Sequence, residues 1–427
     1  MATALAGAGD AVVGGLDRHA HPLATTDPDA AGDRDLAPFG RMVGYADVVG
    51  VGEATHGSTE FVATKQRLLR HLAEHEGFRA FAQEVSWSTG LLLDDYVVHG
   101  TGDPRAIMSR ELQYVHRFFN SQELLDLIEW IRDHNERHAE KLRFVGADLA
   151  FAGPVVFDRV VAYAAGVDPA LAARLTELYA GLRPDPDVGL LEYSTAMRAL
   201  PLAEREDRRD RAIAAYDLVA AVPDDGDEPA WAVQHARSIV QHTTAFAFDL
   251  ETPEGFAAQS RYRDEVLAEN VVWWQRQTGD RILVSAQNGH VGYETNDAVF
   301  IPRPMGAHLR DRLGDAYVST GFTFDSGTFH AFEADSFFDP SGPVAGTFAV
   351  EPGAPGSNED VLDRVRFDDY LVDLRRVTGP ARRWLAEPRP THNAGLLWPE
   401  EPEQVALGRT YDLLIHLDEV HRSRLLP

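Results

Sequence analysis

Residues 48–57 read Val48-Val49-Gly50-Val51-Gly52-Glu53-Ala54-Thr55-His56-Gly57, an apolar run with strand character that ends in a glycine, a carboxylate and a histidine. The residues that follow, 58–75, repeat apolar side chains at helical spacing. A strand that leads at once into a helix places Glu53 and His56 at the carboxyl edge of a sheet, where α/β proteins bind ligands. An acid beside a histidine there is a candidate general-base pair. The alternative is that Glu53 caps the helix and His56 is an ordinary loop residue.

The same design recurs at three later places in the chain. Residues 80–85, 143–148 and 281–286 are short apolar segments typical of buried strands, and each ends in polar residues. The first delivers Glu84, the second Asp148, and the third runs into Gln287-Asn288-Gly289-His290. Because parallel strands end at one edge of a sheet, we expect a single cleft lined by Glu53, His56, Glu84, Asp148 and His290.

These segments predict an α/β fold, with a central mixed or parallel sheet flanked by helices. Residues 1–30 are rich in Ala, Gly and Asp and are expected to form a loosely ordered arm. Residues 31–152 form the first part of the α/β core, and 278–427 form the second part, which is β-rich after His290. Between them, 153–277 show helical spacing and predict an insertion over the cleft.

Two further elements are predicted in the carboxyl-terminal part. Residues 317–324 and 328–332, separated by Asp325-Ser326-Gly327, are typical of a β-hairpin. His416 and His421 are expected on an amphipathic helix, as surface or packing residues. A Ser/His nucleophile in the hairpin is rejected, because the chain has no G-x-S-x-G elbow.

Several motifs, in order, resemble the erythromycin esterase-like family. They are Gly52-Glu53-Ala54-Thr55-His56-Gly57, Ala82-Gln83-Glu84, Gly146-Ala147-Asp148, Arg263-Asp264 with Glu269-Asn270, Asn288-Gly289-His290-Val291, and Asp373-Leu374-Arg375. The resemblance spans about residues 35–385. It implies a deep cleft in which His56 activates water without a covalent intermediate and without a metal. Glu53 and Glu84 would position the base and the water, and His290 would face the substrate.

The chain departs from this family at two positions. Members with esterase activity carry an arginine where this chain has Lys65, and a further histidine where it has Gln287. Lysine lacks the planar fork that holds two carboxylates, and an amide cannot exchange a proton near neutral pH. We expect Lys65, Gln287, Asn288 and Asp148 to bind the substrate.

Three functions stay open at this stage. The first is hydrolysis of an ester or lactone of a small molecule, such as a macrolide, which would confer antibiotic resistance. The second is a repurposed cyclase or dehydratase that acts on a natural-product intermediate in secondary metabolism. The third is a metal-dependent hydrolase or a non-catalytic binder, because Glu53, His56, Glu84 and His290 are also a possible zinc or manganese ligand set.

Composition limits the partners. The net charge of −27 disfavours nucleic acid and anionic membranes, because both require a concentrated basic face. Without cysteine the chain has neither disulfides nor thiol nucleophiles. Glu53 directly after the glycine pair would repel a phosphate, so we expect no nucleotide cofactor. The amino terminus lacks a signal-peptide pattern, and we expect a cytoplasmic protein.

Overall fold

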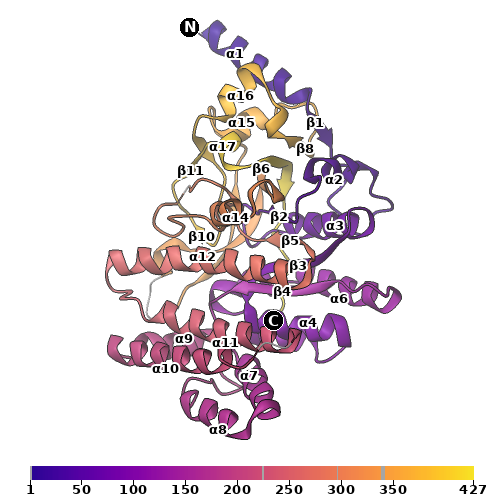
Figure 1. The fold of residues 1–427 in the computed structure, drawn as a ribbon. Coiled ribbons are helices and arrows are strands. Elements are labelled where there is room, and N and C mark those ends of the chain that lie inside the picture. Colours follow the sequence, from indigo (N-terminus) through magenta and orange to yellow (C-terminus); the bar gives the residue numbers. More distant parts are fainter. Residues whose placement is uncertain (1, 224–225, 296, 338–341) are drawn as a thin grey trace.

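The computed structural model describes residues 2–223, 226–295, 297–337 and 342–427, and it shows one large mixed sheet between layers of helices (Figure 1). The strands are β1 (Ala20–Pro22), β2 (Val48–Val51), β3 (Phe78–Ser86), β4 (Arg143–Asp148), β5 (Arg281–Ser285), β6 (Tyr317–Glu333), β7 (Ala345–Val350), β8 (Tyr370–Asp373), β9 (Arg389–Thr391), β10 (Leu397–Trp398), β11 (Glu403–Val405) and β12 (Leu413–Val420). The predicted α/β class is confirmed.

The central strands run in one direction. In the order β4, β3, β5, β2, β6 and β12, each strand is paired parallel with the next. The antiparallel strand β8 follows β12, and β1 closes that edge. The carboxyl ends of β2, β3, β4 and β5 therefore lie at one edge of the sheet, which is where the predicted polar residues stand.

Helices connect these strands and cover both faces. They are α1 (Ala2–Asp17), α2 (Ala37–Val43), α3 (Thr59–His75), α4 (Trp87–His99), α5 (Pro104–Glu111), α6 (Gln122–Arg137), α7 (Pro154–Val167), α8 (Pro169–Leu178), α9 (Leu190–Ala199), α10 (Leu202–Ala220), α11 (Asp227–Phe246), α12 (Pro253–Thr278), α13 (Asn288–Val291), α14 (Met305–Leu313), α15 (Asn358–Leu362), α16 (Gly379–Leu385) and α17 (Leu407–Thr410). Helix α12 begins at an N-cap, where the Thr252 side chain accepts from Gly255 N, and it ends at the left-handed Gly279.

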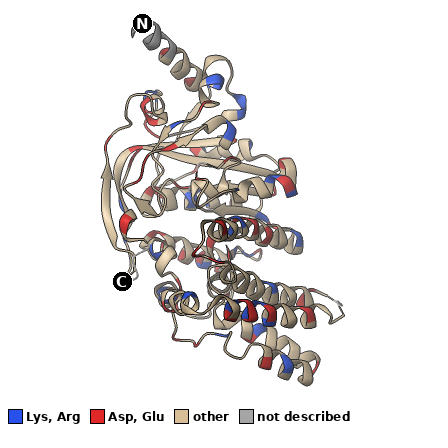
Figure 2. Cartoon of the chain, turned by 90° about the vertical axis from the view of Figure 1, so that its left-hand side faces the viewer, with Lys and Arg blue, Asp and Glu red and all other residues tan. Residues whose placement is uncertain are grey.

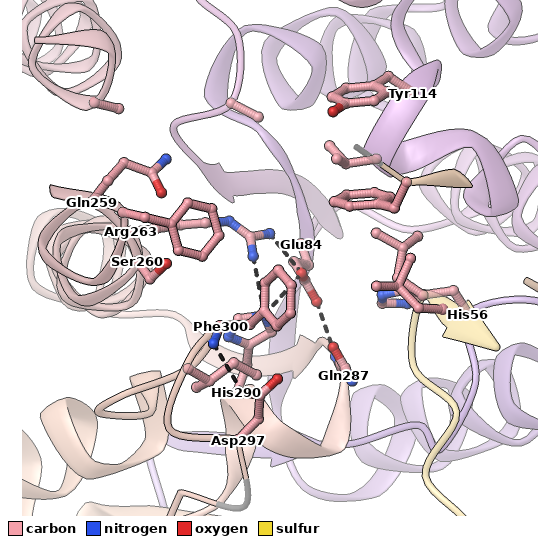
Figure 3. Close-up of a pocket in the computed structure, with 18 of the residues that line it drawn as sticks. His56, Glu84, Tyr114, Gln259, Ser260, Arg263, Gln287, His290, Asp297 and Phe300 are labelled. Atoms are coloured by element: carbon pink, nitrogen blue, oxygen red, sulfur yellow. Dashed lines mark hydrogen bonds and ion pairs between the residues drawn. The ribbon is translucent and has the colours of Figure 1, made fainter. Parts of the chain in front are cut away.

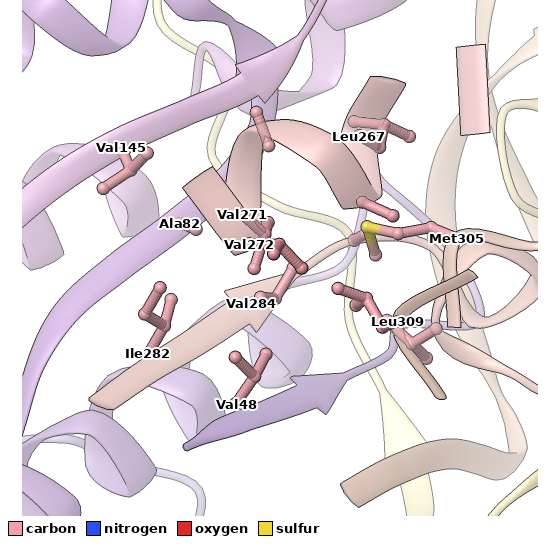
Figure 4. Packing of buried hydrophobic residues seen from close by; sticks show 14 of the residues in the cluster. Val48, Ala82, Val145, Leu267, Val271, Val272, Ile282, Val284, Met305 and Leu309 are labelled. Atoms are coloured by element: carbon pink, nitrogen blue, oxygen red, sulfur yellow. The ribbon is translucent and has the colours of Figure 1, made fainter. Parts of the chain in front are cut away.

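Alternate residues of each strand pack on opposite faces of the sheet. Val48 belongs to the core cluster under α12, while Val49 belongs to the cluster under α3. On β5, Ile282 and Val284 pack against α12, as Figure 4 shows, and Leu283 points to the other face. This period of two, with both faces apolar, is what a parallel sheet covered on both sides requires.

Three expectations differ from the structure. Residues 317–333 form the single long strand β6, because β12 pairs along Thr320–Gly327 and β7 takes over from Gly327 onward. The predicted hairpin is therefore wrong. The predicted helix around His416 is also wrong, since the residue lies fully buried on β12, which pairs on both sides. Within residues 1–30, the structure shows helix α1 and the paired strand β1 in place of a loose arm.

Between residues 154 and 278, the described residues form helices α7 to α12 and their connections, and α7–α11 gather at the end of the molecule opposite α1 and α16 (Figure 1). That residues 153–277 are a separate insertion stays a prediction. Acidic and basic residues are interspersed along these helices (Figure 2). None of the helices in the described part of the chain combines the length and apolar character needed to cross a membrane.

Candidate active site

A cavity lies at the carboxyl edge of the sheet. His56, Glu84, Gln287 and His290 line it, and they follow or end strands β2, β3 and β5 (Figure 3). Helices α9, α11 and α12 supply much of the remaining wall, which includes Leu190, Ser194, Arg198, Phe246, Phe256, Gln259, Ser260 and Arg263. The helical segment therefore covers the strand ends.

His56 is held from behind by a buried chain of ionic contacts. Its Nδ1 lies 2.6 Å from Glu53 Oε1, and the other oxygen of Glu53 accepts from Lys65 Nζ at 2.5 Å. Lys65 Nζ also donates to Ser285 Oγ at 2.9 Å. Glu53 and Lys65 are both about 1% exposed. A carboxylate can only accept, so His56 Nδ1 is the donor and Nε2 is left for the cavity.

A second network occupies the opposite wall, around Arg263 on α12. Its guanidinium donates to Glu84 Oε1 at 2.7 Å and to Asp148 Oδ2 at 2.5 Å. In Figure 3 this guanidinium approaches Glu84 from the side opposite His56. Glu84 also accepts from the backbone N–H of Gln287 at 2.9 Å. Glu84 is thus fixed in the space between the two histidines.

His290 is enclosed by carboxylates. Its Nδ1 lies 2.8 Å from Asp264 Oδ1, and its Nε2 lies 3.2 Å from Glu84 Oε1. Asp264 also accepts from Met305 N at 2.7 Å, which fixes the carboxylate in place. With an acceptor at each ring nitrogen, the arrangement favours the imidazolium form.

The electrostatics separate the two histidine environments. Burial lowers the pKa of His290, but Asp264 and Glu84 outweigh it and raise the value to about 10. Burial would raise the pKa of Glu84, yet His290 and Arg263 hold it well below its usual range. Glu53 likewise has a lowered pKa, because Lys65 and His56 overcome the effect of burial. At neutral pH, His290 is therefore a fixed cation and both glutamates are anions.

Four of the expected site residues lie behind the cavity wall. Glu53 and Lys65 stand behind His56. Asp148 is fully buried under Arg263. Asn288 bonds to the backbone N–H and C=O of Phe322, so its side chain joins the segment after β5 to the interior of β6. The expected substrate contacts of Lys65, Asp148 and Asn288 are thus replaced by contacts within the protein. Gln287 does line the cavity.

Sequence reasoning missed three residues of this network. Arg263 and Asp264 are consecutive on α12, where one turns to the cavity and the other to His290. The Arg263-Asp264 motif was visible, but no local pattern indicated that a distant helix reaches the strand ends. His116 is 1% exposed, and its Nε2 lies 3.5 Å from Asp148 Oδ2. No sequence pattern predicted the contact between His116 and Asp148.

A carboxylate group forms another part of the lining. Asp297, Glu400 and Glu403 all border the cavity. Burial, with repulsion from Asp297 and Glu400, raises the pKa of Glu403 to about 7, although Asn393 donates to it at 2.7 Å. The cavity thus combines a cationic patch around Arg263 with an acidic patch.

The possible metal ligands Glu53, Glu84 and His290 are already engaged by other groups of the protein. Lys65 already occupies an oxygen of Glu53, and Arg263 occupies one of Glu84. Both ring nitrogens of His290 face carboxylates. A divalent cation at this position would meet two fixed positive charges in a site of low dielectric, which opposes its binding.

Comparison with known proteins identifies the family. The erythromycin esterase family model matches residues 73–420. The chain belongs to the erythromycin esterase family. The matched region includes Glu84, Arg263 and His290, whereas Glu53 and His56 precede it. The erythromycin esterase-like assignment is confirmed, and with it the membership in a family of small-molecule hydrolases.

The similar proteins include some that are named esterases and some that carry other names. The erythromycin esterase type II of Escherichia coli is 24% identical over 75% of this chain and 81% of its own length. A crystal structure of a Bacillus cereus protein has a TM-score of 0.87 at 29% identity, covering 98% of this chain and 99% of that one. A succinoglycan biosynthesis protein has a TM-score of 0.82 at 26% identity, covering 98% of both chains. An erythromycin esterase variant in its open conformation has a TM-score of 0.72 at 17% identity, covering 94% of this chain and 98% of that one; this likeness concerns the fold alone.

Proposed function

We propose that this member of the erythromycin esterase family hydrolyses an ester or lactone of a small molecule, with His56 as the general base for water. One observation carries the proposal: only one of the two cavity histidines is free to accept a proton. His290 is held as a cation by Asp264 and Glu84, while His56 has a single carboxylate partner on the side away from the cavity.

In the proposed step, Nε2 of His56 takes a proton from a water molecule in the cavity. Glu53 accepts from Nδ1 and stabilises the imidazolium that forms. Lys65 keeps Glu53 ionised and oriented. Glu84, which is close enough to His56 to interact with it electrostatically, is placed to accept a hydrogen bond from the other O–H of the same water and so to orient it. The hydroxide oxygen then attacks the carbonyl carbon directly. The tetrahedral intermediate collapses by breaking the ester C–O bond, and the departing alkoxide takes the proton from the His56 imidazolium.

The opposite wall supplies positive charge for the developing oxyanion. Arg263 is the candidate contact, because its guanidinium borders the cavity and is a quarter exposed. His290 lies directly behind it, with Nε2 3.2 Å from Arg263 Nη1. Fixed donors in a closed site stabilise such charge without reorganisation, and losing one typically costs a factor of about 10²–10³ in turnover.

The contacts support a metal-independent reaction. Lys65 and Arg263 perform the charge compensation that a metal would otherwise provide. The proposal therefore requires activity after exhaustive chelation. An enzyme that loses its activity with chelator and regains it with zinc or manganese would instead use the metal-dependent mechanism.

For the substrate we propose a polyfunctional small molecule with an apolar body and a cationic group. Aromatic and aliphatic side chains of the cavity suit the body, and the acidic patch of Asp297, Glu400 and Glu403 suits a cation such as an amino sugar. A macrolide has both features. The erythromycin esterase named among the relatives supports this class for the present chain.

Gln287 favours a second candidate, a cyclase or dehydratase that uses the same base. The amide lines the cavity in place of a proton-exchanging histidine. One similar protein is named for succinoglycan biosynthesis, so the scaffold is associated with a name other than esterase. His56 would then remove a proton from carbon or from a hydroxyl group of the substrate.

Mass spectrometry of purified enzyme with a panel of macrolides, simpler lactones and amino-sugar esters tests the proposal. A gain of one water, reduced about a hundredfold or more in His56→Asn, is the expected result. Formation of an isomer or loss of water would favour the second candidate. Gln287→His is the matched comparison: hydrolysis that appears only in that variant would contradict the assignment for the natural chain.

A further inference from the structure

A histidine pair and an aspartate meet on the surface, on the sheet face covered by α3. His71 and His75 are four residues apart, in the last turns of α3, so they share one side of the helix. Asp33 reaches them from the segment before α2. Its Oδ2 lies 2.6 Å from His71 Nδ1 and 2.9 Å from His75 Nε2.

The three side chains present ligand atoms to a single point. One atom from each lies within 4.8 Å of the other two. A transition-metal ion binds nitrogen and oxygen at about 2.0–2.2 Å, so ligand atoms around it are roughly 3.3 Å apart. The present separations are shorter, and an opening of about half an ångström would admit an ion. Exposure of His75 (49%) and Asp33 (36%) provides access and leaves room for a water ligand.

The surroundings also suit a metal-binding imidazole. The His71 side chain is 5% exposed and cannot swing away easily. A Cβ on Gly40 would lie 3.1 Å from His71 Nε2 and 2.7 Å from Glu76 Oε1, so this nitrogen and this carboxylate share the space beside the glycine. When a metal replaces the proton on Nδ1, the proton must move to Nε2, and a nearby carboxylate stabilises that tautomer.

We propose that Asp33, His71 and His75 form a binding site for one divalent transition-metal ion such as Zn²⁺, apart from the catalytic cavity. Two imidazoles and one carboxylate form a ligand set typical of zinc, with the remaining position left to water. Binding displaces or relocates the protons that now link the histidines to Asp33.

The bound ion would link the segment of residues 23–36, which contains Asp33, to helix α3. Other contacts already follow the same path. Arg67 on α3 donates to both oxygens of Asp35, at 3.0 and 2.9 Å. Arg70 donates to the backbone oxygen of Pro28. Helix α3 also carries Lys65, so the site reinforces the helix that supports Glu53 without contacting the substrate.

The test uses tag-free, chelator-stripped protein and titrates it with Co²⁺, read by its visible absorption, and with Zn²⁺, read by calorimetry. Wild type should bind one ion per chain. His75→Gln and Asp33→Asn should each weaken binding at least tenfold, and zinc should raise the melting temperature of wild type more than that of either variant.

A matched control is available at the carboxyl end of α6, where His134 lies in the last turn and His138 directly follows the helix. His134 and His138 have the same spacing, and their rings stack 3.9 Å apart, but in the described part of the chain no third ligand group joins them. His138→Gln should leave binding unchanged, and so should His56→Asn. Wild-type affinity in His75→Gln, loss of binding in either control, or no binding by wild type would overturn the proposal.

Discussion

At the residue scale, the site separates two histidines by their environments. His56 faces one carboxylate, whereas His290 is enclosed by two and carries a raised pKa of about 10. The strand-end motifs predicted from sequence that His56, Glu84 and His290 lie together. The same motifs placed Glu53 and Asp148 in the cleft lining, whereas both lie behind its wall. The motifs could not show which histidine is a fixed cation, because the carboxylate of Asp264 comes from a distant helix. They also could not show that Lys65 points inward at Glu53.

We expect Lys65→Met to destabilise the fold by roughly 3–5 kcal/mol, because Glu53 would remain buried without its cation. Chemical denaturation measures the change. The double variant Glu53→Gln/Lys65→Met removes both charges and should recover most of the loss. Equal destabilisation in the single and double variants would show that the ion pair is not the cause.

The raised pKa of His290 predicts a pH dependence of stability. Its folded-state value of about 10 lies above the ~6.5 of an unfolded histidine, so its contribution is complete below pH ~6.5. The contribution falls as the pH rises towards 10, by up to about 1.4 kcal/mol per pH unit. In denaturation curves between pH 7 and 10, His290→Gln should show a shallower decline than wild type. Parallel declines would contradict the assignment.

At the element scale, the strands around the site were predictable and two carboxyl-terminal elements were not. Apolar runs that end in polar residues marked β2, β3, β4 and β5. Residues 325–327 have turn composition, yet β6 continues through them because β12 and β7 supply partners there. Around His416, neighbouring strands on both sides bury residues that local periodicity assigned to a helix. Pairing between distant segments decided both cases.

Gly327 allows the long strand, with a φ of +134° and a Cβ position 2.0 Å from Val420 O. Gly327→Ala should therefore lower the free energy of unfolding by at least about 1–3 kcal/mol. Gly166→Ala, in open space on α7, is the control and should be neutral or slightly stabilising. Denaturation midpoints of the two variants give the comparison. An unaffected Gly327→Ala protein would mean that the strand can relax away from β12.

At the scale of the whole molecule, the sheet edge supplies the proposed catalytic residues, and helices α9, α11 and α12 line the remainder of the cavity. The sequence indicated helices over the cleft but not which side chains they contribute. The molecule is also strongly acidic, with a net charge of −27. Charge of one sign around a cleft concentrates ligands of the opposite sign and is weakened by salt.

For a cationic ester and its neutral isostere, we therefore expect a higher kcat/KM for the cation, with the advantage declining as ionic strength rises. Steady-state kinetics at several salt concentrations measure both effects. Glu400→Gln, in the acidic patch, should reduce the preference. A preference for anionic substrates would show that the cationic side of the cavity, around Arg263, governs selection instead.

In the proposed reaction, His56 activates water for direct attack. A single turnover with an ester or lactone substrate in ¹⁸O-labelled water, quenched and analysed by mass spectrometry of product and protein, tests it most directly. We expect one solvent ¹⁸O atom in the new carboxylate, an unmodified protein, and loss of this labelling in His56→Asn. An acyl-enzyme adduct, a product formed without solvent oxygen, or full labelling in His56→Asn would contradict it.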